Sequence, residues 1–393
     1  MAFTIEEQLL LSGFLPTPSS QARLPSLAPA IADWPALVIR AEKLLLSPLL
    51  RAQLAQTDLL KTLLEAARTR LETGHQVWAA RHLAYVSEAQ RLLRAFADND
   101  VPALPLKGAA LLLMNVYPQA GLRPALDLDI LIEPTHIARA EQIAETCGYA
   151  VVSGRTAARP SQRLPNELNH TAPRRGANGL LLELHTRAFY FVQGQRAFGW
   201  NEMNERASFS EGLRLAASED LALHLLHHTM VDWQSSQTIL RTLADLHFLF
   251  AADDRTRARL RERAASFELQ NTVTLAEAAL HWLAASSQEE PSPNVALLLE
   301  TALLPESRVV AEAARLFEYL DFSRRPTERL RALAALLFTN RTHLTQLYGD
   351  ATFPAQNYWK RPLDLLRKFP WNSLRLESLR RMRRLRRLVH HKN

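Results

Sequence analysis

Cysteine, glycine and long hydrophobic runs are all scarce in this chain of 393 residues. Cys147 is the sole cysteine, which excludes disulfides within the chain and any cysteine-rich metal site. Glycine occurs 12 times while leucine and alanine dominate, and that composition favours helices. No uncharged apolar run reaches the roughly 18–20 residues that a membrane-spanning helix needs. The sequence therefore predicts a mainly helical protein without a transmembrane segment.

The N-terminal stretch "MAFTIEEQLLLSGF" carries early acids and has no basic region before its apolar residues. It therefore lacks the pattern of a secretory signal. A single cysteine also suits a reducing compartment. We therefore expect a cytoplasmic protein.

The net charge of +7 is concentrated at the C-terminal end. Residues 360–393 hold twelve Lys and Arg against Asp364 and Glu377, a balance of +10 that leaves −3 for residues 1–359. The body is thus near neutral, and a basic surface spread over the whole protein is not indicated. The tail "LRLESLRRMRRLRRLVHH" combines arginines with an apolar stripe. It predicts a docked terminal helix, a surface for RNA, anionic lipid or an acidic partner, or disorder.

Hydrophobic periodicity divides the chain into three parts. Residues 1–96 form an N-terminal helical region, residues 97–205 a compact α/β core, and residues 206–393 a C-terminal helical domain with a basic terminal helix. We therefore predict an α+β fold, mainly helical, in which a small mixed sheet is flanked by helical regions. In the core, the expected strands are "ALPLKG", "ALDLDILIE", "YAVVSG" and "GLLLELHTRAF". Residues 155–178 are expected to form a loop or an irregular hairpin arm, and residues 135–147 a helix with Thr135 as its N-cap.

Two acids stand one residue apart in the apolar strand "ALDLDILIE". On a strand, Asp127 and Asp129 point to the same face with Cα atoms about 6.6 Å apart, while Leu126, Leu128, Ile130 and Ile132 occupy the other. Two parallel carboxylates repel each other, and a divalent cation removes that cost. Glu183, a lone acid in "LLLELH", is the candidate third ligand. Three such carboxylates can hold two Mg²⁺ ions, the arrangement used in phosphoryl transfer; the alternative is a solvated acidic face.

The segment "LKGAALLLMNVY" passes from a strand through Gly108 directly into a helix. Glycine lets backbone approach a ligand, and the first amides of a helix attract anions. Lys107 adds a positive charge beside Gly108 and Ala109. Arg123, just before the acidic strand, can reach a phosphate or fix the loop.

The stretch "LPLKGAALLLMNVYPQAGLRPALDLDILIEP", followed by "CGY" and "LELH", resembles the uncharacterised nucleotidyltransferase family with a Lys-Gly…Arg…Asp-x-Asp signature. That family belongs to the DNA polymerase β-like nucleotidyltransferase superfamily. The resemblance implies that Asp127, Asp129 and Glu183 are the metal-binding carboxylates. In this sequence, Lys107 and Gly108 stand where the superfamily usually has a Gly-Ser pair, and 19 positions separate Gly108 from Asp127.

Several polar residues beyond this motif leave alternatives open. His224 and His228 have the i,i+4 spacing that can bind zinc on a helix, but they equally suit a helix core or the lining of a nucleotide pocket. His185 follows Glu183 and is a further candidate nucleotide contact. Arg241 and Asp245 lie one helical turn apart. They can form an ion pair, link packed elements or contact the substrate.

These observations predict a Mg²⁺-dependent nucleotidyltransferase, with two metal ions and Mn²⁺ as a substitute. It would transfer a nucleoside monophosphate from a nucleoside triphosphate, ATP first among them, to an unidentified acceptor. The acceptor is a hydroxyl- or phosphate-bearing small molecule, peptide or protein. The alternative is a catalytically degenerate protein that binds a nucleotide or a partner.

Overall fold

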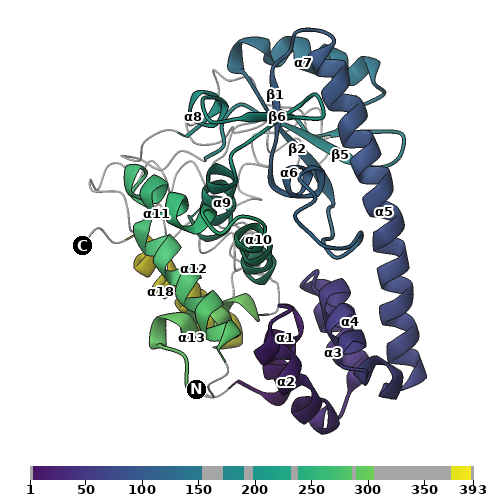
Figure 1. Cartoon of the computed structure of the whole chain (residues 1–393), viewed down its shortest axis with the longest axis vertical. Helices are drawn as coiled ribbons and strands as arrows, with labels where there is room; N and C mark the ends of the chain where they lie inside the picture. The colour runs from purple at the N-terminus through teal and green to yellow at the C-terminus, as the bar shows by residue number, and fades with distance from the viewer. Residues whose placement is uncertain are drawn as a thin grey trace, which may run out of the picture.

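Helices make up most of this molecule, and a small sheet lies at one end of it (Figure 1). A computed structural model describes residues 3–152, 171–189, 198–231, 238–285, 289–304 and 373–390. Their strands form one five-stranded mixed sheet and a two-stranded ribbon. The predicted mainly helical α+β fold is confirmed. Residues 153–170 of the expected arm and residues 305–372 of the C-terminal region lie outside the described residues.

The five-stranded sheet has the order β1-β2-β5-β4-β3. Its central pair, β2 with β5, is parallel, and the other pairs are antiparallel. Each run that was expected to be a strand contains one strand of this sheet, and that strand is shorter than the apolar run itself. The strands are β1 (Ala103–Pro105), β2 (Asp127–Ile132), β3 (Ala150–Val151), β4 (Arg174–Arg175) and β5 (Leu181–His185), and the ribbon pairs β6 (Ser208–Ser210) with β7 (Leu213–Leu215).

The N-terminal helices form a separate layer from the sheet, and one long helix joins the two (Figure 1). The first of them starts with a capping box, in which the side chains of Thr4 and Glu7 each accept a hydrogen bond from the other's backbone amide. The five helices are α1 (Ile5–Gly13), α2 (Pro18–Leu27), α3 (Trp34–Lys43), α4 (Ser47–Gln56) and the 33-residue α5 (Glu65–Ala97).

The remaining helices cover the sheet and build the C-terminal region. The expected N-cap at Thr135 is wrong, because residues Pro134–His136 form a 3-10 turn and the α-helix begins after it. The helices are α6 (Lys107–Leu113), α7 (Ile137–Thr146), α8 (Trp200–Asn204), α9 (Ser218–Leu226) with its π-helical extension η5 (His227–Val231), α10 (Thr238–Ala252), α11 (Thr256–Ser266), α12 (Gln270–Ala284), α13 (Pro293–Ala302) and α18 (Ser373–His390).

The sheet separates two groups of buried side chains. Leu128, Ile130 and Ile132 of β2 pack with α5 and α7 on one face. Leu131 of β2 belongs to a larger group that runs through α1, α4, α9, α10, α12 and α13. The N- and C-terminal helical regions therefore share one core. The boundaries expected after residues 96 and 205 stay predictions.

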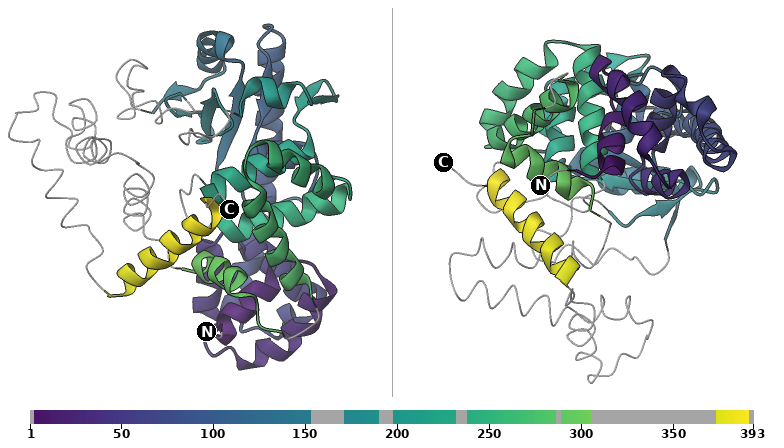
Figure 2. Two further views of the ribbon diagram at one scale, coloured as in Figure 1. Left: turned by 90° about the vertical axis from the view of Figure 1, so that its left-hand side faces the viewer. Right: turned by 90° about the horizontal axis from the view of Figure 1, so that it is seen from below.

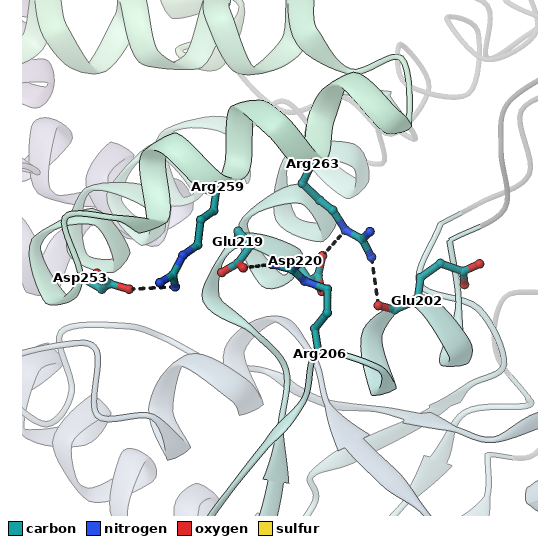
Figure 3. Close-up of polar contacts among 7 residues, drawn as sticks. All are labelled: Glu202, Arg206, Glu219, Asp220, Asp253, Arg259 and Arg263. Carbon is teal, nitrogen blue, oxygen red and sulfur yellow. Dashed lines mark hydrogen bonds and ion pairs between the residues drawn. The ribbon is translucent and has the colours of Figure 1, made fainter.

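Acidic residues at the start of α9 are held by arginines from two other segments (Figure 3). Arg263 of α11 donates to Asp220 at 2.7 Å and to the Glu202 carbonyl oxygen at 3.0 Å. Arg206 pairs with both Glu219 and Asp220. Because Asp220 is fully buried, its charge needs these partners, and the network fixes α9 against α8 and α11.

The basic terminal helix α18 lies against α12, α13 and η5 (Figure 2). Met382, Leu385 and Val389 are buried in the larger core, and Arg381 pairs with Glu300 at 3.1 Å. The docked-helix alternative for the tail is thereby confirmed, while binding of a polyanion by its exposed arginines stays a prediction. In the described part of the chain, no helix is both long and apolar enough to cross a bilayer.

If the apolar stripe of α18 stabilises the fold, Leu385→Ala lowers the free energy of unfolding by about 2–5 kcal/mol, because it empties a fully buried site. Arg384→Ala on the exposed face of the same helix is the control and changes it by less than about 0.5 kcal/mol. Urea unfolding measures both variants. Equal losses would contradict the docking.

Candidate active site

The parallel pairing of β2 with β5 gathers the polar residues of both strands on one face. Asp129 is in register with Glu183, and Leu131 with His185. Residues in register share a face with each other and with those two positions away, so Asp127, Asp129, Glu183 and His185 lie together. Leu128, Ile130 and Ile132 are fully buried on the opposite face, as expected. Leu126 differs, because it precedes the strand and is 53% exposed.

Asp129 lies at the centre of this group and is 1% exposed. Its Oδ1 atom accepts a hydrogen bond from Lys107 Nζ at 2.8 Å and lies 2.8 Å from His185 Nε2. Burial alone would raise the pKa of this carboxyl group. The Lys107 ammonium and the His185 ring outweigh that effect and hold the pKa well below its usual value. Asp129 is therefore ionised at neutral pH.

Backbone geometry places Lys107 over Asp129. The Leu106 amide donates to the Asp129 carbonyl oxygen at 2.9 Å, which extends the pairing of β1 with β2 by one bond. Lys107 then adopts a φ of 45°, in the left-handed region, as α6 begins. Such a backbone costs a non-glycine residue about 1–2 kcal/mol. Its ion pair with Asp129 offsets this strain and keeps the ammonium at the carboxylates.

Asp127 has the opposite electrostatic situation. The negative charge of Asp129, followed by burial, raises the pKa of Asp127, and the nearby cations Lys107 and Arg241 act against that rise. The Tyr85 hydroxyl of α5 donates to the Asp127 carbonyl oxygen at 2.7 Å and fixes the start of the strand. Two neighbouring carboxylates that resist joint ionisation fit a site for an additional cation.

Asp129, Glu183 and His185 form the group of potential metal ligands found among the described residues. One ligand atom from each lies within 4.8 Å of the others, and His185 Nε2 is 3.9 Å from Glu183 Oε2. Sequence reasoning named Asp127, Asp129 and Glu183 as the ligands and placed His185 with the nucleotide. The period-two spacing of Glu183 and His185 in "LELH" was the signal that both share the acidic face. The metal-binding role of each residue stays a prediction.

Arg123 is buried away from solvent in an ion pair. Its Nε and Nη2 atoms donate to Asp245 Oδ1 and Oδ2 of α10 at 2.9 and 3.0 Å, and the Tyr117 hydroxyl donates to Asp245 Oδ1 at 2.5 Å. Of the two roles considered for Arg123, this geometry favours fixing the loop before β2 over binding a phosphate. Sequence reasoning missed the partnership with Asp245 and Tyr117, since nothing local links residues more than 120 positions apart.

Gly108 makes room for Arg123. A Cβ atom at Gly108 would lie 2.2 Å from Arg123 Nη1 and 3.1 Å from its Cζ. Ala109 is fully buried, and the Ala110 amide already donates to the Leu106 carbonyl oxygen at 3.2 Å. The need for glycine here is thus explained within the protein, and phosphate binding by Gly108 and Ala109 stays a prediction.

Two histidines of α9 and η5 extend this region. His224 is 1% exposed, and within the described residues neither ring nitrogen has a hydrogen-bond partner. The centroids of the His224 and His228 rings lie 6.2 Å apart. Burial, followed by the charges of Lys107, His228 and His185, holds the pKa of His224 well below its usual value. In the described part of the chain, no third potential ligand joins His224 and His228 in a group that could hold zinc.

Gly108→Ala is expected to lower the free energy of unfolding by about 1–3 kcal/mol, because the paired guanidinium of Arg123 cannot yield to the new methyl group. Gly74→Ala in α5, where a Cβ would meet no atom within 4 Å, is the control. It is expected to stabilise the helix by roughly 0.5–1 kcal/mol. Denaturant unfolding of both variants measures the difference. Equal effects of the two substitutions would contradict this account of Gly108.

The buried state of His224 predicts a pH dependence of stability. Its pKa is lower in the folded than in the unfolded chain, so unfolding takes up a proton once the pH falls below about 6.5. This lowers the free energy of unfolding by up to about 1.4 kcal/mol per pH unit. Urea unfolding between pH 7.5 and pH 5.5 gives the free energy of unfolding at each pH. Its dependence on pH should be weaker for His224→Leu than for the wild type. An unchanged dependence would refute the prediction.

The comparisons with known proteins concern the same part of the chain. A family model described as uncharacterised nucleotidyltransferase matches residues 31–284, which include the sheet, α5 to α12 and all the site residues described above. No curated protein and no solved structure matches the sequence. The matched span is well over half of the chain, and so this protein belongs to that nucleotidyltransferase family and is an enzyme that transfers nucleotidyl groups.

Proposed function

We propose that this enzyme transfers a nucleoside monophosphate from a nucleoside triphosphate to an acceptor oxygen in a reaction that depends on Mg²⁺. The observation that carries the proposal is the shared face of β2 and β5, where Asp127, Asp129, Glu183 and His185 meet the ammonium of Lys107. Carboxylate oxygens are the ligands that Mg²⁺ prefers, and Mn²⁺ also accepts imidazole nitrogen.

The residues of the site divide into cation ligands and phosphate contacts. Asp127, Asp129 and Glu183 are the proposed ligands, with His185 beside them. When bound, the metal supplies positive charge to the phosphate oxygens as negative charge builds up on them. Lys107, whose ammonium contacts Asp129 near the start of β2, is the proposed source of a second positive charge. The Lys107 side chain is 14% exposed, so part of it reaches the surface of the site.

The reaction itself replaces the phosphoanhydride bond between the α- and β-phosphates with a bond between the α-phosphorus and the acceptor oxygen. The acceptor oxygen forms a bond to the α-phosphorus, the bond from that phosphorus to the bridging oxygen of the β-phosphate breaks, and pyrophosphate leaves. The acceptor gives up its proton to solvent or to a base. Catalysis of this type depends on positioning and on electrostatic stabilisation, with little covalent work for the protein. The proposed acceptor is a hydroxyl- or phosphate-bearing small molecule, peptide or protein, and ATP is the first nucleotide to test.

Asp127→Asn is expected to reduce nucleotidyl transfer by at least about 100-fold, since it removes a carboxylate from the site. Stability should be unchanged or higher, because the substitution removes repulsion from Asp129. Asp98→Asn, on the exposed end of α5, is the control and keeps wild-type activity. Transfer of label from α-³²P-labelled nucleoside triphosphates to a fractionated cell extract, in Mg²⁺ or EDTA, measures activity.

Calorimetry with each nucleoside triphosphate in Mg²⁺ or EDTA completes the test. Metal-dependent binding by the wild type with label transfer supports the proposal. Binding without transfer to any fraction supports the catalytically degenerate alternative. Transfer that persists in EDTA, or in Asp127→Asn, would contradict the assigned metal site.

A further inference from the structure

We infer that Arg241 of α10 binds the phosphate chain of the nucleoside triphosphate, held at the carboxylate site by the buried cluster of Arg123, Asp245 and Tyr117. This inference rests on the proposed function and adds a residue to its substrate site.

The cluster fixes α10 to the loop that leads into the acidic strand. Asp245 receives two hydrogen bonds from Arg123 and one from Tyr117, and Arg123 and Asp245 are 5% and 1% exposed. Arg123 precedes Asp127 by only four residues. Arg241 lies one turn before Asp245, so the two share a face of α10 with Cβ atoms about 5–6 Å apart. The link therefore brings Arg241 to the end of β2 where Asp127 begins the strand.

The charge of Arg241 acts on the site. The Arg241 guanidinium interacts electrostatically with the carboxylates of Asp127 and Asp245 and with the nearby Arg123 guanidinium. Two guanidinium groups thus lie near one carboxylate, Asp245, whose oxygens are already bonded to Arg123 and Tyr117. The bonds of Asp245 to Arg123 and Tyr117 therefore leave the guanidinium of Arg241 without a hydrogen bond to this carboxylate.

The hydrogen-bonding groups of Arg241 are also available. Its side chain is half-buried, yet within the described residues it has no hydrogen bond or ion pair, although a guanidinium carries five donors. Partial burial of an unpaired guanidinium is costly unless a ligand completes its contacts. A planar fork of donors matches two oxygens of a phosphate group, as arginine does at many phosphate sites. A polyphosphate aligned on the neighbouring carboxylates and their metal supplies those oxygens.

Two variants test this assignment against a purely structural role. Arg241→Gln removes the charge, and Arg241→Lys keeps the charge but removes the fork. Arg259→Gln, on the surface of α11 and paired with Asp253, is the matched control. For each protein, calorimetry measures binding of ATP, GTP, CTP and UTP with Mg²⁺, electron paramagnetic resonance measures binding of Mn²⁺ alone, and a thermal melt monitors the fold.

We expect Arg241→Gln to weaken binding of the preferred triphosphate by about 10- to 100-fold and Arg241→Lys to weaken it less, because charge-assisted bidentate contacts are lost. Binding of Mn²⁺ alone should be unchanged or tighter, since a positive charge near Asp127 has been removed. Arg259→Gln should bind both ligands like the wild type.

The outcomes separate this inference from the proposed function. A wild-type protein that binds none of the four triphosphates overturns the proposed function and this inference with it. If the wild type binds a triphosphate and both Arg241 variants bind it with the same affinity, this inference is overturned while the proposed function stands. A parallel loss of nucleotide binding, Mn²⁺ binding and melting temperature in both Arg241 variants also overturns it, because it shows a structural role.

Discussion

The register of β2 against β5 is the constraint on which the site depends. It sets Asp129 beside Glu183 and leaves the interleaved Leu128, Ile130 and Ile132 for the core under α5 and α7. A slip by one residue would move the acids into that apolar layer and the aliphatic side chains to the other face. The hydrophobic pattern that stabilises the sheet therefore also specifies which side carries the carboxylates, and folding and site formation depend on the same pairing.

Nearby positive charge explains how the pairing of β2 with β5 can bring several carboxylates together. An ion pair at about 4 Å contributes roughly 4 kcal/mol at an effective dielectric constant of 20, whereas burying one ion costs several kcal/mol. Lys107 and His185 compensate Asp129, which is ionised, but not the whole group, because the pKa of Asp127 is still raised. The protein's own cations thus do not neutralise all the carboxylates near Asp127, and a bound divalent cation would supply the missing positive charge.

Period-two and helical spacing were enough to predict four of the five sheet strands, the surrounding helices and the common face of Asp127 and Asp129, but not β4, which lies in the expected arm. Both signals are local, so they carry no information about which strand lies next to which. The adjacency of Glu183 was an inference from an isolated acid, and the contact of His185 with Asp129 was not foreseen. The role of Arg123 was left open for the same reason, since its partner Asp245 lies on a helix that tertiary packing brings to the loop.

The signature residues act in this structure as one connected unit. Lys107 contacts Asp129 in the acidic strand, Gly108 leaves space for Arg123, and Arg123 holds α10 through Asp245. Arg123 belongs to the signature although its guanidinium binds Asp245 of α10, which indicates that the pattern encodes placement as well as chemistry. The same link that satisfies two buried charges also sets the position of Arg241, so the helical region contributes to the site through a contact that the α/β core cannot make alone.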